Sequence, residues 1–295
     1  MIVATGFFDG VHIGHRRLLR ELVDVSHLRG DESLVITFWP HPRNVLQDEA
    51  RNLRLLTSLE EKKSMLSGLG VDKVEVIAFT KEFSCLSTEE YLREYVIGRY
   101  GGTAILLGYD NRMGSDPGTP DEIASIAGSL GLDVIRADKV DSESGVTISS
   151  TVIRNLLSEG EVEEAASMLG YRYELFGVVV SGNQFGRTIG FPTANMQLYE
   201  PLKLVPKVGV YAVEVETLGK RFKGMCNIGY RPTVCSAHSL TIETNIFDFD
   251  ENIYGLDIRI SFVRKIREER KFPSVNELRS QLCEDKQKIL LSLAD

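Results

Sequence analysis

The segment Gly6-Phe7-Phe8-Asp9-Gly10-Val11-His12-Ile13-Gly14-His15 follows a short apolar run at the start of the chain. The run Met1–Thr5 is typical of a β-strand, and His15–His27 places leucines and valines at roughly helical spacing. Parallel α/β sheets bind nucleotides where a strand passes through such a loop into a helix, because the helix N-terminus offers free N–H groups and a positive dipole end. The glycines let the backbone approach phosphates closely. The segment therefore predicts an α/β fold with a nucleotide site at its first turn.

The two histidines of this segment indicate a chemistry. His12 and His15 are three residues apart, so they can lie on one face of the first helical turn and donate hydrogen bonds to phosphate oxygens. Adenylyl transfer needs such donors, because charge moves from the α-phosphate to the departing pyrophosphate. Taken alone, the pair is also compatible with solvated histidines at a helix start.

The rest of the first half alternates short apolar runs with amphipathic stretches. The expected strands are 34–38, 74–79, 103–107 and 133–137, and the expected helices are 59–69, 88–100 and 121–130. Alternation of this kind predicts a parallel sheet with helices on its faces.

A hydroxyl-rich motif, Ile148-Ser149-Ser150-Thr151-Val152-Ile153-Arg154, ends this half. Its hydroxyl groups can cap a helix, and Arg154, one turn further, is placed to bind a leaving pyrophosphate. In isolation, Ser-Ser-Thr is an ordinary capping signal. Combined with the histidine pair at the other end of the same α/β half, it favours a nucleotide site.

The second half changes character near Gly170. The expected strands are rich in β-branched and aromatic residues and are separated by Gly and Pro: 174–180, 210–216, 222–228, 241–247 and 257–263. An antiparallel barrel or sandwich is predicted, with a terminal amphipathic helix over Pro273–Leu293. The boundary is expected between Leu157 and Tyr171, which gives domains 1–170 and 171–295.

Three features of this half carry possible chemistry. The loop with Gly182, Gly186 and Arg187 differs from a Walker A loop, since its spacing is one residue short and arginine replaces lysine, but its amides can still wrap phosphates. Thr193 and Asn195 point to the same side of an extended strand and offer the neutral oxygen ligands that suit Mg²⁺, although Pro-Thr-Ala-Asn is also an ordinary turn sequence. Glu243 is a candidate base for phosphoryl transfer to an alcohol, or simply a solvent-facing strand residue.

Composition limits the remaining possibilities. A chain of 295 residues has room for two domains, and its net charge of -8 argues against a general nucleic-acid binder. The four cysteines are scattered without a CxxC pair, which fits a reducing cytosol. There is no signal-peptide pattern and no run of about 18 apolar residues, so we expect a cytoplasmic protein without a membrane span.

The histidine and serine–arginine motifs together resemble the HIGH nucleotidyltransferase superfamily, and GFFDGVHIGH looks like the adenylyltransferase module of bacterial riboflavin kinase/FAD synthetases. The segments 37–42 and 108–114 agree with this resemblance. It implies an ATP site at Gly6, Phe8, Asp9, Gly10, Gly14, Ser149, Ser150 and Thr151, and flavin contacts at Phe38, Pro40, His41, Pro42 and Arg112. It places Asp110 near the reacting phosphates. Phe7, Asn111 and Met113 depart from the usual Asn, His and Phe of the family.

The second half resembles riboflavin kinases through GRTIGFPTAN at 186–195, the segments 207–212 and 227–233, and the Glu243 segment. The resemblance implies a six-stranded β-barrel, Mg²⁺ at Thr193 and Asn195, and the base at Glu243. It also implies ATP contacts at Gly182, Gly186, Arg187 and Pro192, and a terminal helix, carrying Arg279, that helps to close over the flavin. Asn245 stands where many members have histidine, which excludes an imidazole role there.

The resemblance implies a bifunctional enzyme that phosphorylates riboflavin to FMN and adenylylates FMN to FAD, with ATP as co-substrate twice. Its expected ligands are riboflavin, FMN, FAD, ATP and Mg²⁺, with no nucleic acid or membrane partner, and the oligomeric state is open. One alternative is a HIGH-type transferase for a non-flavin acceptor joined to an unrelated barrel. Another is a flavin-binding or regulatory protein in which one or both sites do not turn over.

Overall fold

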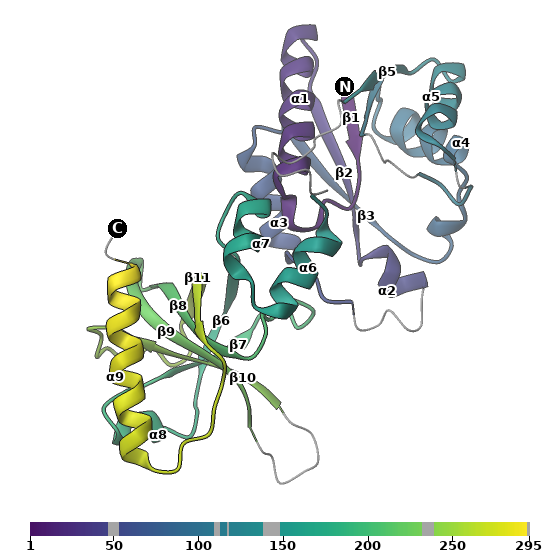
Figure 1. Ribbon diagram of the computed structural model, residues 1–295. Coiled ribbons are helices and arrows are strands. Elements are labelled where there is room, and N and C mark those ends of the chain that lie inside the picture. The colour runs from purple at the N-terminus through teal and green to yellow at the C-terminus, as the bar shows by residue number, and fades with distance from the viewer. Residues whose placement is uncertain (47–52, 109–112, 117, 138–147, 232–238, 294–295) are drawn as a thin grey trace. The chain divides into compact units, whose positions relative to one another are not determined.

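A five-stranded parallel sheet is built around the first strand of the chain in the computed structural model, which describes residues 1–46, 53–108, 113–116, 118–137, 148–231 and 239–293 (Figure 1). The strand order is β3-β2-β1-β4-β5. The strands are β1 (Ile2–Thr5), β2 (Ser33–Trp39), β3 (Lys73–Ala78), β4 (Ala104–Leu107) and β5 (Asp133–Arg136). Every pairing is parallel, which confirms the prediction from the alternating pattern.

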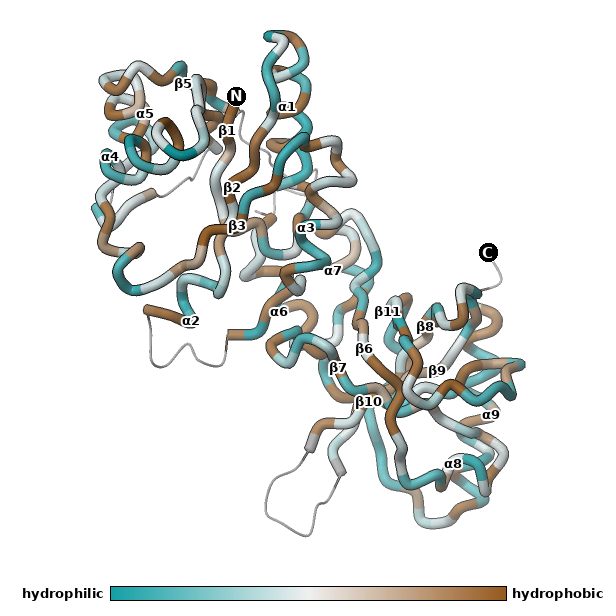
Figure 2. Tube along the Cα trace, turned by 180° about the vertical axis from the view of Figure 1, so that it is seen from behind, coloured by the Kyte–Doolittle hydropathy of each residue, from teal (hydrophilic) through white to brown (hydrophobic). Residues whose placement is uncertain are grey.

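Helices cover both faces of this sheet. Successive side chains of β1 point to opposite faces, so they pack against different helices. The helical elements are η1 (Asp9–Val11), α1 (Ile13–Arg29), α2 (Pro42–Leu46), α3 (Leu59–Gly68), η3 (Phe83–Cys85), α4 (Thr88–Tyr91), the π-helix η4 (Leu92–Arg99) and α5 (Pro120–Ser129). Ile2 and Ala4 pack in one core with α1 and α3, whereas Val3 packs in the other with α4, η4 and α5. In Figure 2 the strands of this sheet are mostly brown or pale, whereas the trace of α1 contains many teal residues.

The strand order reverses at β1, which has β2 on one side and β4 on the other. In open α/β sheets the crevice outside the carboxyl ends of the strands at such a reversal is where ligands bind. The loop 6–12 leaves β1 at that edge, so the topology puts the predicted phosphate loop at the expected position.

The second half forms a closed barrel in the order β10-β7-β6-β11-β8-β9, which decides between the barrel and the sandwich. The strands are β6 (Glu174–Val180), β7 (Ala194–Leu198), β8 (Gly209–Thr217), β9 (Lys220–Arg231), β10 (Ser239–Ile246) and β11 (Asp257–Arg267). The short β7 was not among the strands expected from residue composition. A short helix, α8 (Phe185–Thr188), lies in the glycine-rich loop, and the terminal helix α9 (Val275–Ser292) packs against β9 and β11.

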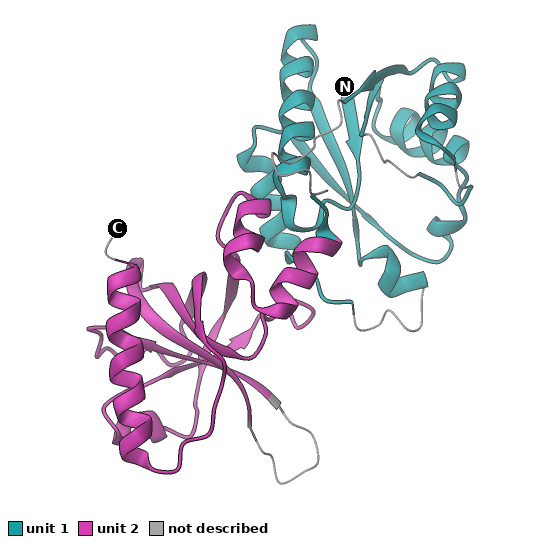
Figure 3. Ribbon diagram, viewed as in Figure 1, with its two compact units in different colours: residues 1–150 teal, residues 151–295 magenta. Residues whose placement is uncertain are grey.

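The chain divides into two units, Met1–Ser150 and Thr151–Asp295 (Figure 3). Most of the helix α6 (Ser150–Glu159) and all of α7 (Val162–Leu169) belong to the second unit, whereas the expected boundary lay after residue 170. The reason is that α7 packs on β11, where Arg264 pairs with Glu163 at 2.9 Å. The functional boundary between the domains stays a prediction.

Candidate active sites

Asp9 anchors the predicted phosphate loop in the first unit. Its side chain is buried, and its carboxylate accepts hydrogen bonds from the backbone N–H groups of Leu56 at 3.0 Å and Thr57 at 3.0 Å. The Thr57 hydroxyl group donates to the same carboxylate and accepts from the N–H of Gly10, each at 3.1 Å. The carboxylate is therefore bound by the protein's own donors and ties the loop to the start of α3.

The glycines of the loop have steric reasons to be glycine. Gly10 has a φ of 79°, a left-handed conformation that favours glycine. A Cβ atom on Gly6 would lie 3.0 Å from the Phe8 ring, and one on Gly14 would lie 3.3 Å from the His12 ring. Gly6 and Gly14 thus leave room for the rings of Phe8 and His12.

His12 and His15 lie face to face at the start of α1. Their ring centroids are 3.6 Å apart with an interplanar angle of 17°. His12 caps the helix, since its Nδ1 accepts from the His15 backbone N–H at 3.3 Å, and its proton is therefore assigned to Nε2. The predicted pair is thus brought together, with His12 able to donate through Nε2.

Burial holds the pKa of His15 well below 6.5, and the neighbouring charges of His12 and Lys62 lower it further. His15 is consequently neutral at neutral pH. Its Nδ1 atom is buried and has no hydrogen-bond partner within the described parts of the chain. A neutral imidazole still offers one N–H donor to a phosphate oxygen.

The hydroxyl-rich motif meets the loop through one residue. The Ser150 hydroxyl group donates to the backbone oxygen of Asp9 at 2.9 Å, and Ser149 precedes it directly. Thr151 and Arg154 lie on the part of α6 that belongs to the second unit, and their roles stay predictions.

Two other predicted residues, Asp110 and Arg112, follow β4 and lie outside the described residues. Met113 is described and is buried in the sheet core, where it packs with Leu107 and Ile123.

The predicted flavin wall lies at the end of β2. Phe38 contacts the rings of Phe79, Phe83 and Tyr91 at centroid distances of 5.9, 5.6 and 6.3 Å. Pro40 follows a cis peptide bond, and Pro42 begins α2. His41 meets the ring of Phe7 edge-on, with the centroids 4.0 Å apart. This contact joins the wall to the phosphate loop.

Lys62 on α3 was missed by the sequence reasoning. Its ammonium group lies 3.9 Å from the centre of the Phe7 ring and donates to the Phe7 carbonyl oxygen at 3.0 Å. The signal was present, because Lys62 stands four residues before the buried Leu66 and so lies on the apolar face of its helix.

In the second unit, the predicted metal ligands and base come together on neighbouring strands. The Thr193 hydroxyl group donates to Glu243 Oε2 at 3.3 Å. The register pairs Glu243 on β10 with Asn195 on β7 and with Asn227 on β9. Residues directly opposite one another share a face of the sheet, so Asn227 joins the predicted set although its motif alone did not mark it as a site residue.

The glycine-rich loop packs tightly on this segment. A Cβ atom on Gly182 would lie 2.3 Å from Asn195 Nδ2, and one on Gly186 would lie 2.2 Å from the Phe191 carbonyl oxygen. Asn245 donates from Nδ2 to the Pro192 carbonyl oxygen at 2.6 Å. Asn245 therefore stabilises the turn before Thr193. Unlike the histidine that many members of the resembled family have at this position, its side chain does not titrate.

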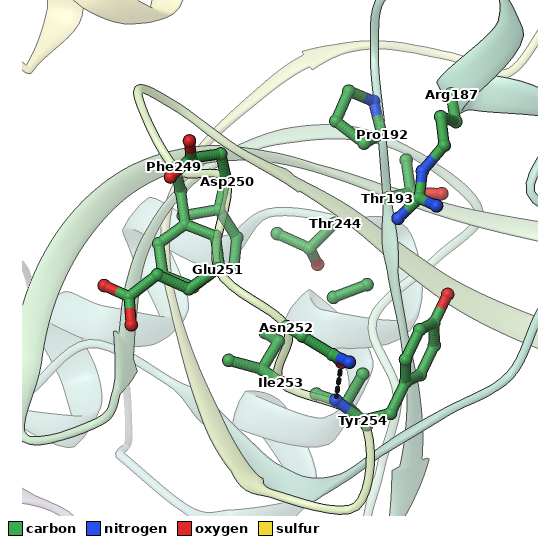
Figure 4. A pocket seen from close by; sticks show the side chains of 13 residues that line it. Arg187, Pro192, Thr193, Thr244, Phe249, Asp250, Glu251, Asn252, Ile253 and Tyr254 are labelled. Carbon is green, nitrogen blue, oxygen red and sulfur yellow. Dashed lines mark hydrogen bonds between the residues drawn. The ribbon is translucent and has the colours of Figure 1, made fainter.

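Two cavities flank the pair formed by Thr193 and Glu243, and Thr193 lines both. The first, of about 350 Å³, contains the predicted ATP contacts Arg187 and Pro192 (Figure 4). In Figure 4, Thr193, Thr244 and Tyr254 surround the same space, and the Tyr254 backbone N–H donates to Asn252 Oδ1 at 3.2 Å. The lining combines the Arg187 side chain with the carboxylates of Asp250 and Glu251.

The second cavity, of about 370 Å³, lies between the barrel and α9. Its lining includes Asn227, Glu243, Arg267, Arg270, Phe272, Leu278 and Leu282. Arg279, the predicted flavin contact on α9, is exposed and is not part of this lining, because its helical neighbours Leu278 and Leu282 occupy the face toward the barrel. Arg267 and Arg270 bring the positive charge instead.

The neutral oxygens of Thr193 and Asn195, beside the Glu243 carboxylate, form a donor set of the kind that Mg²⁺ takes together with water and phosphate. No group of three or more His, Cys, Asp or Glu side chains in the described ranges could hold a metal ion. No helix in the described part of the chain is long and apolar enough to cross a membrane.

Both units of the chain are similar to known proteins. The FAD synthetase family model matches residues 1–152, and the riboflavin kinase model matches residues 169–293. The bifunctional riboflavin kinase/FMN adenylyltransferase of Bacillus subtilis is 37% identical, covering 98% of this chain and 91% of the relative. The proteins of the same name from Listeria monocytogenes and Escherichia coli are 39% and 35% identical, covering 97% and 96% of this chain and 90% of each relative.

A crystal structure titled a macrolide-efflux protein, from Streptococcus pneumoniae, has a TM-score of 0.90 and 32% identity, covering 97% of this chain and 92% of its own. Its title names a different activity, whereas the family models and the curated relatives agree with one another. On the identity and coverage of those relatives, the chain belongs to the bifunctional riboflavin kinase/FMN adenylyltransferase family.

Proposed function

We propose that this chain phosphorylates riboflavin to FMN in its second unit and adenylylates FMN to FAD in its first, with one ATP consumed in each reaction. Both activities are those of its family. The observation that carries the assignment of residues is the hydrogen bond of 3.3 Å between Thr193 and Glu243, with Asn195 directly opposite Glu243 across the strands.

In the kinase reaction, Glu243 accepts the proton of the riboflavin 5′-hydroxyl group as that oxygen attacks the γ-phosphate of ATP. A new O–P bond forms, the bond to the bridging oxygen breaks, and ADP leaves. Such a transfer depends mainly on positioning and charge neutralisation. The cavity under α9 supports riboflavin as the ligand near Glu243, because apolar side chains of α9 and Phe272 line it beside Arg267 and Arg270.

Thr193 and Asn195 are the residues that would hold Mg²⁺ in this unit. When bound, Mg²⁺ neutralises phosphate charge and orients the nucleotide. The close packing of Gly182 on Asn195 and the tie from Asn245 to Pro192 support a preformed turn at these ligands. Removal of divalent ions with a chelator should stop riboflavin phosphorylation, and addition of Mg²⁺ should restore it.

In the adenylyl transfer, an oxygen of the FMN phosphate attacks the α-phosphate of ATP, and pyrophosphate leaves. The start of α1 provides backbone N–H groups for the phosphates, and His12 donates through Nε2. His15, neutral and stacked on His12, supplies a second imidazole donor. Arg154 and Asp110 keep the roles that the family resemblance implies.

The base is tested with Glu243→Gln and the matched control Glu216→Gln, which changes an exposed glutamate on β8 of the same barrel. The carboxamide cannot accept the hydroxyl proton as a carboxylate does. We expect riboflavin phosphorylation to fall about 10²-fold or more, as is typical for loss of a general base, while FMN-to-FAD conversion continues. The control should retain both activities.

Chromatography of riboflavin, FMN and FAD during incubation with ATP and Mg²⁺ measures both steps. FMN should rise first and FAD should follow. Full phosphorylation by the Glu243→Gln protein would remove Glu243 from the mechanism. Binding of flavin without ATP consumption by the unmodified protein would instead favour a flavin-binding function.

A further inference from the structure

Lys62 is a buried cation that no step of the proposed reactions uses. Its side chain lies on α3 with a relative exposure of 1%. Its ammonium group donates to the carbonyl oxygens of Phe7 at 3.0 Å and Phe38 at 3.4 Å. Burial lowers the pKa of Lys62 to about 8, and the negative charge of Asp9 opposes this shift. Both hydrogen-bond acceptors are neutral, and burial of an ammonium group is costly. The cost of burying Lys62 indicates that its ammonium group has a function in this position.

The fold brings Lys62 to this position through Asp9. The carboxylate of Asp9 holds the backbone of Leu56 and Thr57, which directly precede the helix cap. Ser58 then starts α3 with a reciprocal capping box to Glu61, and Lys62 follows within the first turn. Asp9, which anchors the phosphate loop, thus also fixes the position of Lys62 at the start of α3.

The lysine contacts two predicted parts of the adenylyltransferase site at once. Phe7 belongs to the phosphate loop after β1, and its carbonyl oxygen also accepts from the Thr37 hydroxyl group at 3.1 Å. Phe38 belongs to the flavin wall at the end of β2. The Phe7 ring lies 3.9 Å from the ammonium group and meets the His41 ring of the wall at 4.0 Å. Loss of the Lys62 ammonium group would therefore remove a contact that holds the Phe7 ring in place, and the Phe7 ring in turn contacts His41.

We propose that Lys62 is a positioning residue of the adenylyltransferase site, whose buried ammonium group fixes the phosphate loop and the flavin wall relative to each other so that FMN is bound in the reactive pose. This inference rests on the function proposed for the first unit. Its charge also acts on the histidine pair, because the positive Lys62 is one of the causes that lower the pKa of His15.

The test compares Lys62→Met with the matched control Lys63→Met in the full-length protein. Methionine has nearly the same length but neither charge nor hydrogen-bond donor. Lys63 is the next residue on α3, with 42% of its side chain exposed and a surface contact of 3.5 Å to Glu60. Removal of the ammonium group takes a donor from the Phe7 and Phe38 carbonyl oxygens and a positive charge from the surroundings of Asp9. The Lys62→Met protein is therefore expected to melt below the unmodified protein, and both are assayed at a temperature at which they are folded.

We expect the KM for FMN in Lys62→Met to rise about fivefold or more, because the flavin wall is no longer held, while the KM for ATP changes by less than about twofold. Riboflavin phosphorylation in the same chain should stay within about twofold of normal, and it serves as the internal measure of intact protein. Lys63→Met should leave all of these values unchanged.

A KM for FMN that stays within about twofold in Lys62→Met overturns the inference, whether or not kcat falls, since a merely structural role reduces the amount of active protein and not its affinity. Failure of the proposed function is a separate result. It shows as the absence of FAD formation from FMN by the unmodified protein, before any variant is compared.

Discussion

Asp9 stands in the predicted phosphate loop, yet its carboxylate faces the protein interior. It accepts from two backbone N–H groups and from the Thr57 hydroxyl group. A carboxylate turned toward phosphates would repel them, whereas one turned inward orders the loop. The residue therefore serves binding through the shape of the loop.

Asp9→Ala should destabilise the first unit by about 3 kcal/mol, because three donors lose a charged acceptor in a buried place. FAD formation should fall with it, while riboflavin phosphorylation persists. Chemical denaturation followed by both activity assays measures these effects. Asp9→Asn, which keeps one acceptor oxygen, should lie between the two proteins, and an Asp9→Ala protein as stable as the unmodified one would contradict the anchoring role.

His15 makes the stability of the first unit depend on pH. Its pKa in the folded protein lies well below 6.5, the ordinary value that applies to the unfolded chain. At pH values between the folded pKa and 6.5, the unfolded chain therefore binds a proton that the folded chain does not. Stability is therefore fully present above pH 6.5 and is lost as the pH falls through the folded pKa. The slope in that window is at most about 1.4 kcal/mol per pH unit.

The measurement is thermal unfolding at pH 7.5 and 5.5 for the unmodified protein and for His15→Gln. The variant should lose less stability on acidification, since it has no imidazole to protonate. Equal losses in both proteins would show that His15 does not titrate in this way.

Helix α9, which forms one wall of the second cavity, is held on the barrel by its apolar face and by a buried ion pair. Arg267 Nε on β11 lies 2.8 Å from Asp285 Oδ2 on α9, and Gln281 donates to the other oxygen at 2.8 Å. The Asp285 side chain is fully buried, and Arg267 lines the cavity. The helix that forms this wall is thus bound to an arginine that lines the cavity proposed for riboflavin.

Asp285→Asn should cost about 3 kcal/mol in the second unit, because Arg267 is left without its counter-ion. The KM for riboflavin should rise as Arg267 and the helix shift, while FMN adenylylation stays unchanged. Glu284→Gln, at the exposed neighbouring position on α9, is the matched control for the loss of a carboxylate. An unchanged riboflavin KM in Asp285→Asn would mean that the ion pair serves stability alone.

At the scale of the whole molecule, the chain has two units with separate cores and separate proposed sites. Each reaction should therefore survive loss of the other. We expect a mixture of Glu243→Gln and His15→Ala proteins to make FAD from riboflavin, with FMN passing through solution from one chain to the other.

Added FMN-binding protein should slow FAD formation in this mixture by trapping the intermediate. The two variants assayed alone, with riboflavin and with FMN, provide the controls. If each keeps its remaining activity but the mixture makes no FAD, the two reactions require a single intact chain.

Several parts of this protein were determined by the sequence alone. The strand–loop–helix start, the alternation of the first half and the strand-rich second half were all predicted correctly, because they depend on residues close together in the chain and on periodicities of 2 and 3.6. The pairing of His12 with His15 followed from the same local spacing. The short β7 was not among the strands expected from composition, since the Pro-Thr-Ala-Asn run at its start is also typical of a turn, although Thr193 and Asn195 were expected on extended backbone.

Which distant residues share a site depends on the tertiary structure. Thr193 and Glu243 are 50 residues apart in sequence, and the register of β7 with β10 brings them within 3.3 Å. The inward turn of Asp9 and the burial of Lys62 likewise depend on how α3 packs against the loop. Local patterns carry no information on strand register or on the direction of a side chain in a packed core. Both depend on how strands and helices from distant parts of the chain pack together in the sheet and in the barrel.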